Sequence, residues 1–227
     1  MSNFPFATIG FDLDGTLADT VRDLAPAVNH ALKQIRRGPI SPEETRNLVG
    51  GGSRLMLERA LKVSGGMVAE DQFSDLYAAL LEYYEAHIAD HTVLYPGCRD
   101  ALDALTQQGC KLAVVTNKPE FLSLKLLAEL GIRDMFDSVL GGDTLGPGRA
   151  KPAPDMIHQT IALCGGEGAF AMVGDSSFDV RAAQAAGAPC ILLSFGYHDA
   201  PPHSLGAEAV IDHFGKLIPA LEELATR

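Results

Sequence analysis

The chain has 227 residues, of which 47% are hydrophobic, and this is ample for one large buried core or for a core domain that carries an insertion. Its formal net charge of -11 would repel nucleic acids and anionic membranes, so neither is expected as a partner. Because the N-terminus has no basic segment and no apolar stretch approaches the roughly 18 residues of a membrane span, we expect a cytoplasmic protein.

The first predicted element is a buried strand at residues 6–11, which leads directly into the sequence DLDGT at residues 12–16. Two carboxylates, Asp12 and Asp14, thus stand two positions apart where a strand gives way to a glycine turn, and they form an anionic pocket that invites a divalent cation. The alternative is an ordinary Asp-Gly turn with solvated acids. Four fixed positions of this kind arise by chance in a chain of this length only roughly a few times per thousand, so the pattern favours an active site.

Residues 18–92 are predicted to be almost wholly helical, and no strand is evident among them. Apolar residues recur there at the spacing of a helix face. Breaks at residues 38–39, 50–52 and 65–66 divide the segment into about four helices, which is enough for a small bundle. We expect Phe73, Tyr83 and Tyr84 to lie in the core of this bundle rather than to face a substrate.

Helices and strands alternate in the rest of the chain. Helices are predicted at residues 99–108, 121–130, 154–164, 180–186 and 217–224, and strands at 111–116, 138–140, 170–173, 190–193 and 209–211. This alternation implies right-handed βαβ crossovers, so the predicted fold class is α/β, with a doubly wound, mainly parallel sheet. The first strand must join that sheet to satisfy its backbone groups. The predicted domains are therefore an α/β core at residues 1–17 and 93–227 and an inserted helical domain at residues 18–92.

The cysteines and histidines give no sign of a disulfide framework or a zinc site. The four cysteines contain no CxxC pair, so free thiols in a reducing compartment are expected. His87 and His91 share a helical face, but no third zinc ligand is evident.

Polar segments are predicted to meet at the carboxyl ends of the strands, where open parallel sheets bind ligands. These segments are residues 12–14, 116–118, 151–152 and 174–179. Each has an ordinary explanation as well: residues 116–119 could be a capped turn, Lys151 a solvated loop lysine, and Asp175 a helix N-cap. Together, however, they combine two carboxylate pairs with a hydroxyl and a lysine, which suits a phosphoryl group bound with Mg²⁺.

The four segments resemble, in order, the four motifs of the haloacid dehalogenase superfamily of aspartate-based phosphatases. Residues 12–16 resemble motif one, Thr116 motif two, Lys151 motif three, and Gly174-Asp175 with Asp179 motif four. The helices at residues 18–92 resemble the helical cap of that family, so the resemblance spans essentially the whole chain. Within the family the chain is most similar to phosphoglycolate phosphatases, at residues 50–54, 57–61, 95–97, 116–119, 141–143 and 195–197.

This resemblance implies a Mg²⁺-dependent hydrolase of phosphomonoesters, with 2-phosphoglycolate as the first candidate substrate. Asp12 is implied as the nucleophile that forms an aspartyl phosphate, and Asp14 as the acid and base. Dehalogenases typically lack the second aspartate, so Asp14 favours a phosphatase. The implied metal ligands are Asp12, the backbone carbonyl of Asp14, and Asp175.

The same resemblance assigns roles to residues around the phosphate. Lys151 is implied to hold nucleophile and phosphate together, and Thr116 and the amide of Asn117 to bind phosphoryl oxygens. Substrate contacts are expected from Thr16, Asn117, Lys118, Gly52 and Arg54, and support behind the site from Ser176 and Asp179. Arg54 could clamp a substrate carboxylate through two hydrogen bonds, or it could be a solvated arginine at a helix break.

The remaining expectations concern motion, partners and alternatives. A cap that opens and closes is expected to hinge near residues 17–19 and 94–97. The expected partner is a small phosphorylated metabolite, and the chain is expected to be a monomer or a homodimer. The alternatives are a phosphatase or phosphomutase acting on another small ester, such as a sugar phosphate or pyrophosphate, and a non-enzymatic phospho-aspartate switch.

Overall fold

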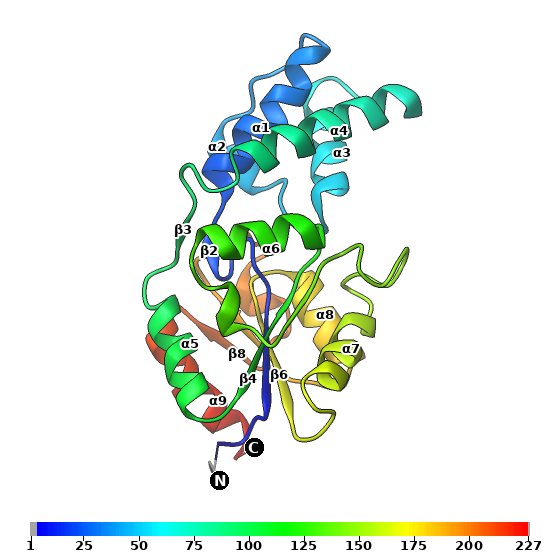
Figure 1. The fold of residues 1–227 in the computed structure, drawn as a ribbon. Helices are drawn as coiled ribbons and strands as arrows, with labels where there is room; N and C mark the ends of the chain where they lie inside the picture. Colours follow the sequence, from blue (N-terminus) through cyan, green and yellow to red (C-terminus); the bar gives the residue numbers. More distant parts are fainter. Residues whose placement is uncertain (1–3, 227) are drawn as a thin grey trace.

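A parallel sheet lies at the centre of the structure, a computed structural model that describes residues 4–226. Among these residues it has six strands in the order β5-β4-β1-β6-β7-β8, with all neighbours parallel. The strands are β1 (Thr8–Phe11), β4 (Lys111–Val115), β5 (Ser138–Leu140), β6 (Phe170–Gly174), β7 (Cys190–Leu193) and β8 (Ala209–Ile211). Figure 1 shows the sheet below a group of helices. The predicted α/β class is confirmed.

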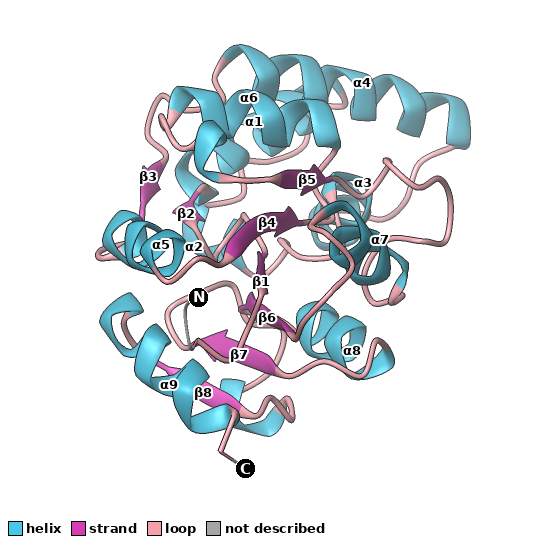
Figure 2. Ribbon diagram, turned by 60° about the horizontal axis from the view of Figure 1, so that its bottom comes forward, coloured by secondary structure: helices cyan, strands magenta, loops and turns pink. Residues whose placement is uncertain are grey.

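Helices cover both faces of the sheet (Figure 2). Side chains alternate between the faces: in β6, Ala171 and Val173 belong to one apolar cluster, and Phe170 and Met172 to the other. The first face carries α5 (Cys98–Gln107), α6 (Glu120–Glu129) and α9 (Leu217–Leu224), and the second carries α7 (Asp155–Leu163) and α8 (Ser177–Ala185). This is the doubly wound arrangement that the sequence predicts.

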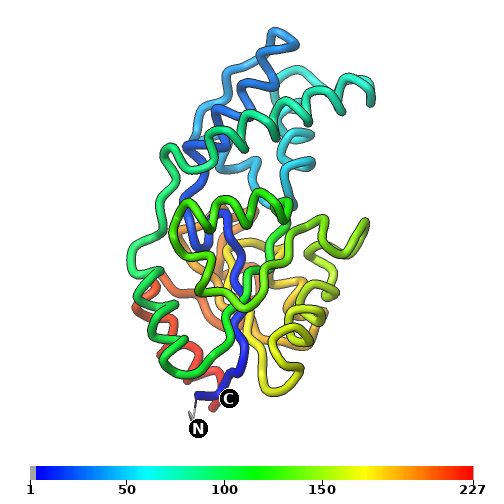
Figure 3. Tube along the Cα trace, in the orientation of Figure 1, coloured from blue at the N-terminus to red at the C-terminus, as the bar shows by residue number. Residues whose placement is uncertain are grey.

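The helical insertion stands above the carboxyl ends of the strands (Figure 3). It consists of α1 (Val21–Gln34), α2 (Pro42–Arg46), α3 (Ser53–Ser64) and α4 (Glu70–Ala86), and it is called the cap below. Its core is apolar, since residues such as Val28, Leu57, Leu61, Phe73 and Leu76 are buried. The glycine breaks thus separate four helices, as predicted.

Two short strands connect the cap to the sheet. β2 (Ala18–Asp19) pairs with β3 (Val93–Leu94) in an antiparallel ribbon, so the chain enters and leaves the cap side by side. The prediction that residues 18–92 contain no strand is therefore wrong at its first two residues. A strand of two residues is too short to show alternation, and its partner lies at the far end of the insertion.

The remaining differences are at the ends of elements. Short 3₁₀ helices at η1 (Arg133–Met135), η2 (Pro202–Ser204) and η3 (Phe214–Lys216) were not predicted. Helix α8 begins three residues earlier than expected, because the carboxylate of Asp179 accepts the backbone N–H of Ser176 and closes the first turn. Within residues 4–226, no helix combines the length and the apolar character that a membrane span requires.

Candidate active site

Three adjacent strands bring the predicted site residues to one edge of the sheet. Asp12 follows β1, Thr116 follows β4 and Asp175 follows β6. Because β1 lies between β4 and β6, Asp12 occupies the middle of this edge. Lys151, from the loop between β5 and α7, lines the same pocket. The four polar segments therefore meet in one place.

Lys151 is buried between two carboxylates. Its Nζ lies 3.1 Å from Oδ1 of Asp12 and 2.6 Å from Oδ1 of Asp179. Burial would lower the pKa of Lys151, but the charges of Asp12 and Asp179 outweigh it and raise this pKa to about 12. Burial raises the pKa of Asp12 to about 6, against the opposing effects of Lys151 and of a hydrogen bond from Thr116. Near neutral pH the site thus pairs a lysine cation with an ionised, poorly solvated carboxylate.

Asp179 orients its neighbours and has little capacity left for a ligand. One carboxylate oxygen accepts from Lys151, and the other accepts from the N–H of Asp175 at 3.2 Å and from the N–H and hydroxyl of Ser176 at 3.0 and 2.8 Å. Asp179 is fully buried, and a Cβ at Gly174 would lie 2.3 Å from its Cγ. Only glycine at position 174 leaves room for this carboxylate.

Asp175 is held by two donors that come from distant parts of the chain. Its Oδ1 accepts the hydroxyl of Thr16 at 3.2 Å, and its Oδ2 accepts the backbone N–H of Tyr197. Burial, followed by the charges of Asp179 and Asp12, raises the pKa of Asp175 well above its ordinary value. Thr16 is fully buried beneath Asp175 and does not line the pocket, so it supports this carboxylate.

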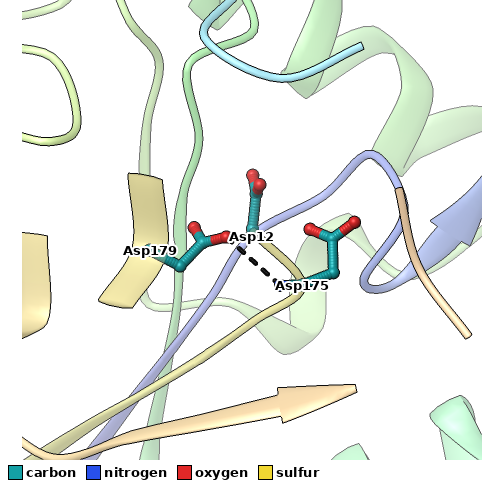
Figure 4. A group of neighbouring side chains, drawn as sticks. All are labelled: Asp12, Asp175 and Asp179. Carbon is teal, nitrogen blue, oxygen red and sulfur yellow. Dashed lines mark hydrogen bonds between the residues drawn. The ribbon is translucent and has the colours of Figure 1, made fainter. Parts of the chain in front are cut away.

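The carboxylates of Asp12, Asp175 and Asp179 form a cluster that suits a hard cation. One oxygen of each lies within 4.8 Å of the others, and Figure 4 shows the side chains next to one another. Lys151 alone cannot balance three ionised carboxylates, and this shortage of positive charge is one reason why the pKa of Asp175 is raised. Since both oxygens of Asp179 already accept hydrogen bonds, Asp12 and Asp175 are the better placed ligands. This donor set fits a divalent cation such as Mg²⁺.

The side chain of Asp14 points to Lys118 and not into this cluster. Nζ of Lys118 lies 3.0 Å from Oδ1 and 3.2 Å from Oδ2 of Asp14. The same Nζ donates to the hydroxyl of Tyr84, on α4 of the cap, at 2.8 Å. Tyr84 is buried, but it lines the pocket. Tyr84 thus belongs to the apolar core, as expected, and in addition it reaches the pocket.

The pocket lies between the core and the cap. Its core side carries Asp12, Thr116, Lys151 and Asp175, and its cap side carries residues 49–53 with parts of α1, α3 and α4. The volume open to the centres of water molecules is about 40 Å³, a few times what one buried water needs. A Cβ at Gly52 would lie 2.8 Å from the carbonyl oxygen of Asn117, so this glycine allows the cap loop to approach the core closely.

The structure does not bring every predicted residue to the pocket. Arg54 is half-exposed, donates to Glu70 at 2.8 Å and covers the ring of Phe73 at 4.5 Å, and it does not line the pocket. Asn117 does line it, while its Nδ2 donates to the carbonyl of Lys151 at 2.8 Å and its Oδ1 is buried without a partner.

Sequence reasoning missed two supporting side chains. Nη1 of Arg59 donates to the carbonyls of Leu48, Val49 and Gly50, each at 3.0 Å, and so holds the cap loop of the pocket. The hydroxyl of Tyr197 donates to Asp19 at 2.6 Å and accepts the N–H groups of Thr20 and Val21. The segments at 195–197 and 57–61, which resemble phosphoglycolate phosphatases, contain Tyr197 and Arg59, but the resemblance gave neither residue a role.

Comparison with known proteins places this site in a family. Residues 9–193 match the family model for haloacid dehalogenase-like hydrolases. A phosphoglycolate phosphatase from Agrobacterium fabrum is 39% identical over 225 residues, which cover 98% of this chain and 96% of that protein.

Solved structures show the same similarity. A predicted phosphoglycolate phosphatase from Haemophilus somnus has a TM-score of 0.88 and 31% identity, over 96% of this chain and 98% of that one. CbbY from Rhodobacter sphaeroides, in a complex with xylulose-1,5-bisphosphate, has a TM-score of 0.78 and 26% identity, over 96% of this chain and 99% of that one.

Proposed function

Since the chain belongs to the haloacid dehalogenase-like hydrolase family and is a phosphatase, we propose that it hydrolyses 2-phosphoglycolate to glycolate and phosphate. Similarity to a phosphoglycolate phosphatase over 98% of the chain carries this choice of substrate. The small pocket between core and cap supports it, because a two-carbon ester needs little room.

Mg²⁺ is the proposed cofactor, held by Asp12, Asp175 and the backbone carbonyl of Asp14. When bound, the ion neutralises negative charge on the phosphoryl oxygens and lowers their repulsion from the carboxylates. Burial and the repulsion between neighbouring carboxylates, which raise the pKa of Asp175, support this assignment, because a cation would relieve both, and so does the all-oxygen donor set. Asp179 keeps Lys151 and the turn before α8 in position.

In the proposed first step, a carboxylate oxygen of Asp12 attacks phosphorus and the bond from phosphorus to the ester oxygen breaks. Asp14 gives its proton to the departing alkoxide, so glycolate leaves as the alcohol. Lys151 and Thr116 bind the phosphoryl oxygens. Since Lys151 keeps its proton at any physiological pH, its charge is present throughout the reaction.

In the second step, water attacks the aspartyl phosphate. Asp14, now a carboxylate, takes a proton from this water, and the bond from phosphorus to the oxygen of Asp12 breaks. Phosphate leaves, and both aspartates return to their first state. The two half-reactions use one acid-base residue in opposite directions.

The cap controls access to this chemistry. Residues of core and cap both line the pocket, so entry of substrate requires their separation. We propose two domains, with the cap at residues 18–92, and we place the hinge at the β2–β3 ribbon. The four cysteines have no disulfide partners, which supports a reducing compartment such as the cytoplasm.

The test is phosphate release from 2-phosphoglycolate beside sugar phosphates, pyrophosphate and nucleotides, with Mg²⁺ and with excess chelator. Metal-dependent preference for 2-phosphoglycolate is the expected result. Preference for a sugar phosphate would keep the mechanism and replace the substrate, and the similarity to the xylulose-1,5-bisphosphate complex makes this the second candidate. An aspartyl phosphate that persists without turnover would contradict both.

A further inference from the structure

The two ends of the pocket differ in chemistry. The sheet end holds Asp12, Thr116 and Lys151, which suit a phosphoryl group. The cap end is mostly apolar, and its side chains include those of Leu24, Val49, Met56, Leu80 and Leu122. A ligand that fills both ends therefore has a polar head and a remainder that meets few hydrogen-bonding groups.

Besides Ser53, whose hydroxyl bonds to Tyr77, two polar side chains interrupt this apolar end. They are Lys118, from the loop after β4, and Tyr84, from α4. The side chain of Lys118 is 3% exposed, and its Nζ lies 4.2 Å from the centre of the Tyr84 ring. Among the described residues that line the pocket, the cationic side chains are Lys118 and Lys151. Lys151 lies between two carboxylates, those of Asp12 and Asp179, whereas Lys118 faces one, that of Asp14. Lys118 is thus the less neutralised of the two cations and the one nearer to the apolar end.

Both side chains have a donor that a substrate can use. Lys118 directs its three N–H bonds to the two carboxylate oxygens of Asp14 and to the hydroxyl of Tyr84, so a substrate carboxylate would take over one of the two bonds to Asp14. The hydroxyl of Tyr84 accepts from Lys118, while its own hydrogen has no acceptor among residues 4–226. Burial, followed by the charges of Asp14 and Asp23, raises the pKa of Tyr84 well above its ordinary value, so this hydroxyl keeps its hydrogen.

The position of Lys118 next to Asp14 determines which part of the substrate can reach the donors of Lys118 and Tyr84. An acid that protonates the leaving oxygen must come within hydrogen-bond reach of it. Lys118 contacts that acid at 3.0 Å, so a bound ester would have the carbon next to its ester oxygen beside Lys118. A carboxylate on this carbon is two bonds from the ester oxygen and falls within the same reach.

We propose that Lys118 and Tyr84 form a receptor for a carboxylate on the carbon that bears the ester oxygen, so that the pocket selects short phosphorylated hydroxy acids. This inference rests on the proposed phosphatase function and adds the residues that determine its specificity. A planar carboxylate can accept from both donors at once. Sugar phosphates bind poorly, because the apolar lining would leave several buried hydroxyls without partners.

The test compares 2-phosphoglycolate with 2-hydroxyethyl phosphate, which has the same length and no carboxylate. The measured quantity is the ratio of their kcat/KM values. Lys118→Met should lower this ratio about 100-fold, and Tyr84→Phe about tenfold, because each removes a hydrogen bond to a charged group. Lys118→Arg should restore part of the ratio, because it restores the charge.

Matched controls lie near both residues. Lys125 is exposed and interacts with Glu85, and Tyr83 is on α4 next to Tyr84, where it stacks on His30 away from the pocket. Lys125→Met and Tyr83→Phe should leave the ratio unchanged. Calorimetric titration of both esters into Asp12→Asn, with and without Lys118→Met, gives a second readout that needs no turnover.

The outcomes separate this inference from the proposed function. If wild-type protein shows no preference for 2-phosphoglycolate, the proposed substrate is wrong. If wild type prefers 2-phosphoglycolate and the ratio persists in Lys118→Met and Tyr84→Phe, the receptor is elsewhere and the function stands. An equal loss of turnover for both esters would show that Lys118 only positions Asp14, and would also overturn the receptor.

Discussion

At the scale of single residues, Asp12 combines a chemical role with a cost to the fold. Its pKa of about 6, against an ordinary value of 3.8, means that burial opposes the ionised form that a nucleophile needs. Lys151 and Thr116 offset part of this cost. A carboxylate that is charged yet poorly solvated is reactive toward phosphorus, and the folded protein is less stable for it.

Because of this cost, Asp12→Asn should lower the activity of the protein and raise its stability. Without the carboxylate, phosphate release should fall by at least about 1,000-fold. In chelator, the variant should be more stable than wild type, by an amount on the order of 3 kcal/mol at most. A raised pKa makes wild type lose stability as pH rises from about 4 to about 6, so the difference should grow over that range and stay constant above it.

Thermal unfolding at several pH values, with chelator, measures this difference. Equal midpoints at every pH would contradict the raised pKa of Asp12. Full hydrolytic activity in Asp12→Asn would contradict its role as nucleophile, whatever the stability.

Gly174 offers a steric test at the same scale. A Cβ at this position would lie 2.3 Å from Cγ of Asp179, so Gly174→Ala must displace the carboxylate that holds Lys151. We expect a loss of kcat of about 100-fold or more, since misplacement by about 1 Å has such an effect. Steady-state kinetics check this, and circular dichroism establishes that the variant folds. A variant with wild-type kcat would show that Asp179 tolerates displacement.

At the scale of elements, Tyr197 joins the start of α1 to the site. Its hydroxyl accepts the N–H groups of Thr20 and Val21, which the helix leaves unpaired, while its own N–H contacts Asp175. Tyr197→Phe should lower the free energy of unfolding by about 2 kcal/mol, because buried N–H groups lose their acceptor. Urea denaturation measures this. Tyr77→Phe is the control: Tyr77 is half-buried and shares one bond with Ser53, so its loss should have a smaller effect.

Arg59 and Arg54 lie on the same helix and differ in what they hold. Arg59 binds three carbonyls of the loop at the pocket, whereas Arg54 pairs with Glu70 outside it. Arg59→Met should raise KM severalfold with a smaller change in kcat, since the loop loses its fixed position. Arg54→Met should change neither. Steady-state kinetics of both variants provide the test. A raised KM in Arg54→Met together with an unchanged KM in Arg59→Met would show that Arg54 contacts the substrate.

Elements were predictable where the signal was local. The strands Ser138–Leu140 and Ala209–Ile211 have the predicted bounds. The second is a short apolar run between Glu208 and Asp212, and the first ends at the glycine pair that follows Leu140. The convergence of Asp12, Thr116, Lys151 and Asp175 followed from the parallel sheet, which places strand ends along one edge. Lys118 and Tyr84 could not be paired in this way, since 34 residues separate them and the contact depends on how the cap sits on the core.

At the scale of the whole molecule, core and cap meet through close contacts around the pocket. A Cβ at Gly52 would collide with the carbonyl oxygen of Asn117, and Tyr84 bonds to Lys118. These contacts exclude water from a buried, charged site, which strengthens its electrostatics. Arg54 was expected at the pocket because it lies two residues after Gly52, which does line it. Its side chain instead pairs with Glu70, on the next helix, outside the pocket.

Burial of the cysteines provides a test of the whole fold. Burial raises the pKa of Cys98 to about 12 and of Cys110 to about 11, and that of Cys190 well above its ordinary value. These thiols carry almost no thiolate at pH 7.5 and lack access to reagents. Iodoacetamide should leave these three thiols intact in the native protein, where the half-buried Cys164 should react first. In urea all four cysteines should be modified. Peptide mass spectrometry measures the order in which the cysteines are modified. Early modification of Cys98 would contradict the packing of α5.

The paired connection of β2 and β3 limits how the cap can travel. One flexible link would act as a ball joint, free to twist and to swing, whereas two strands bonded side by side resist torsion and bend most easily about one axis. On the hinge proposed above, the cap therefore has in effect one degree of freedom, and each closure would return Tyr84 to Lys118 in a single orientation.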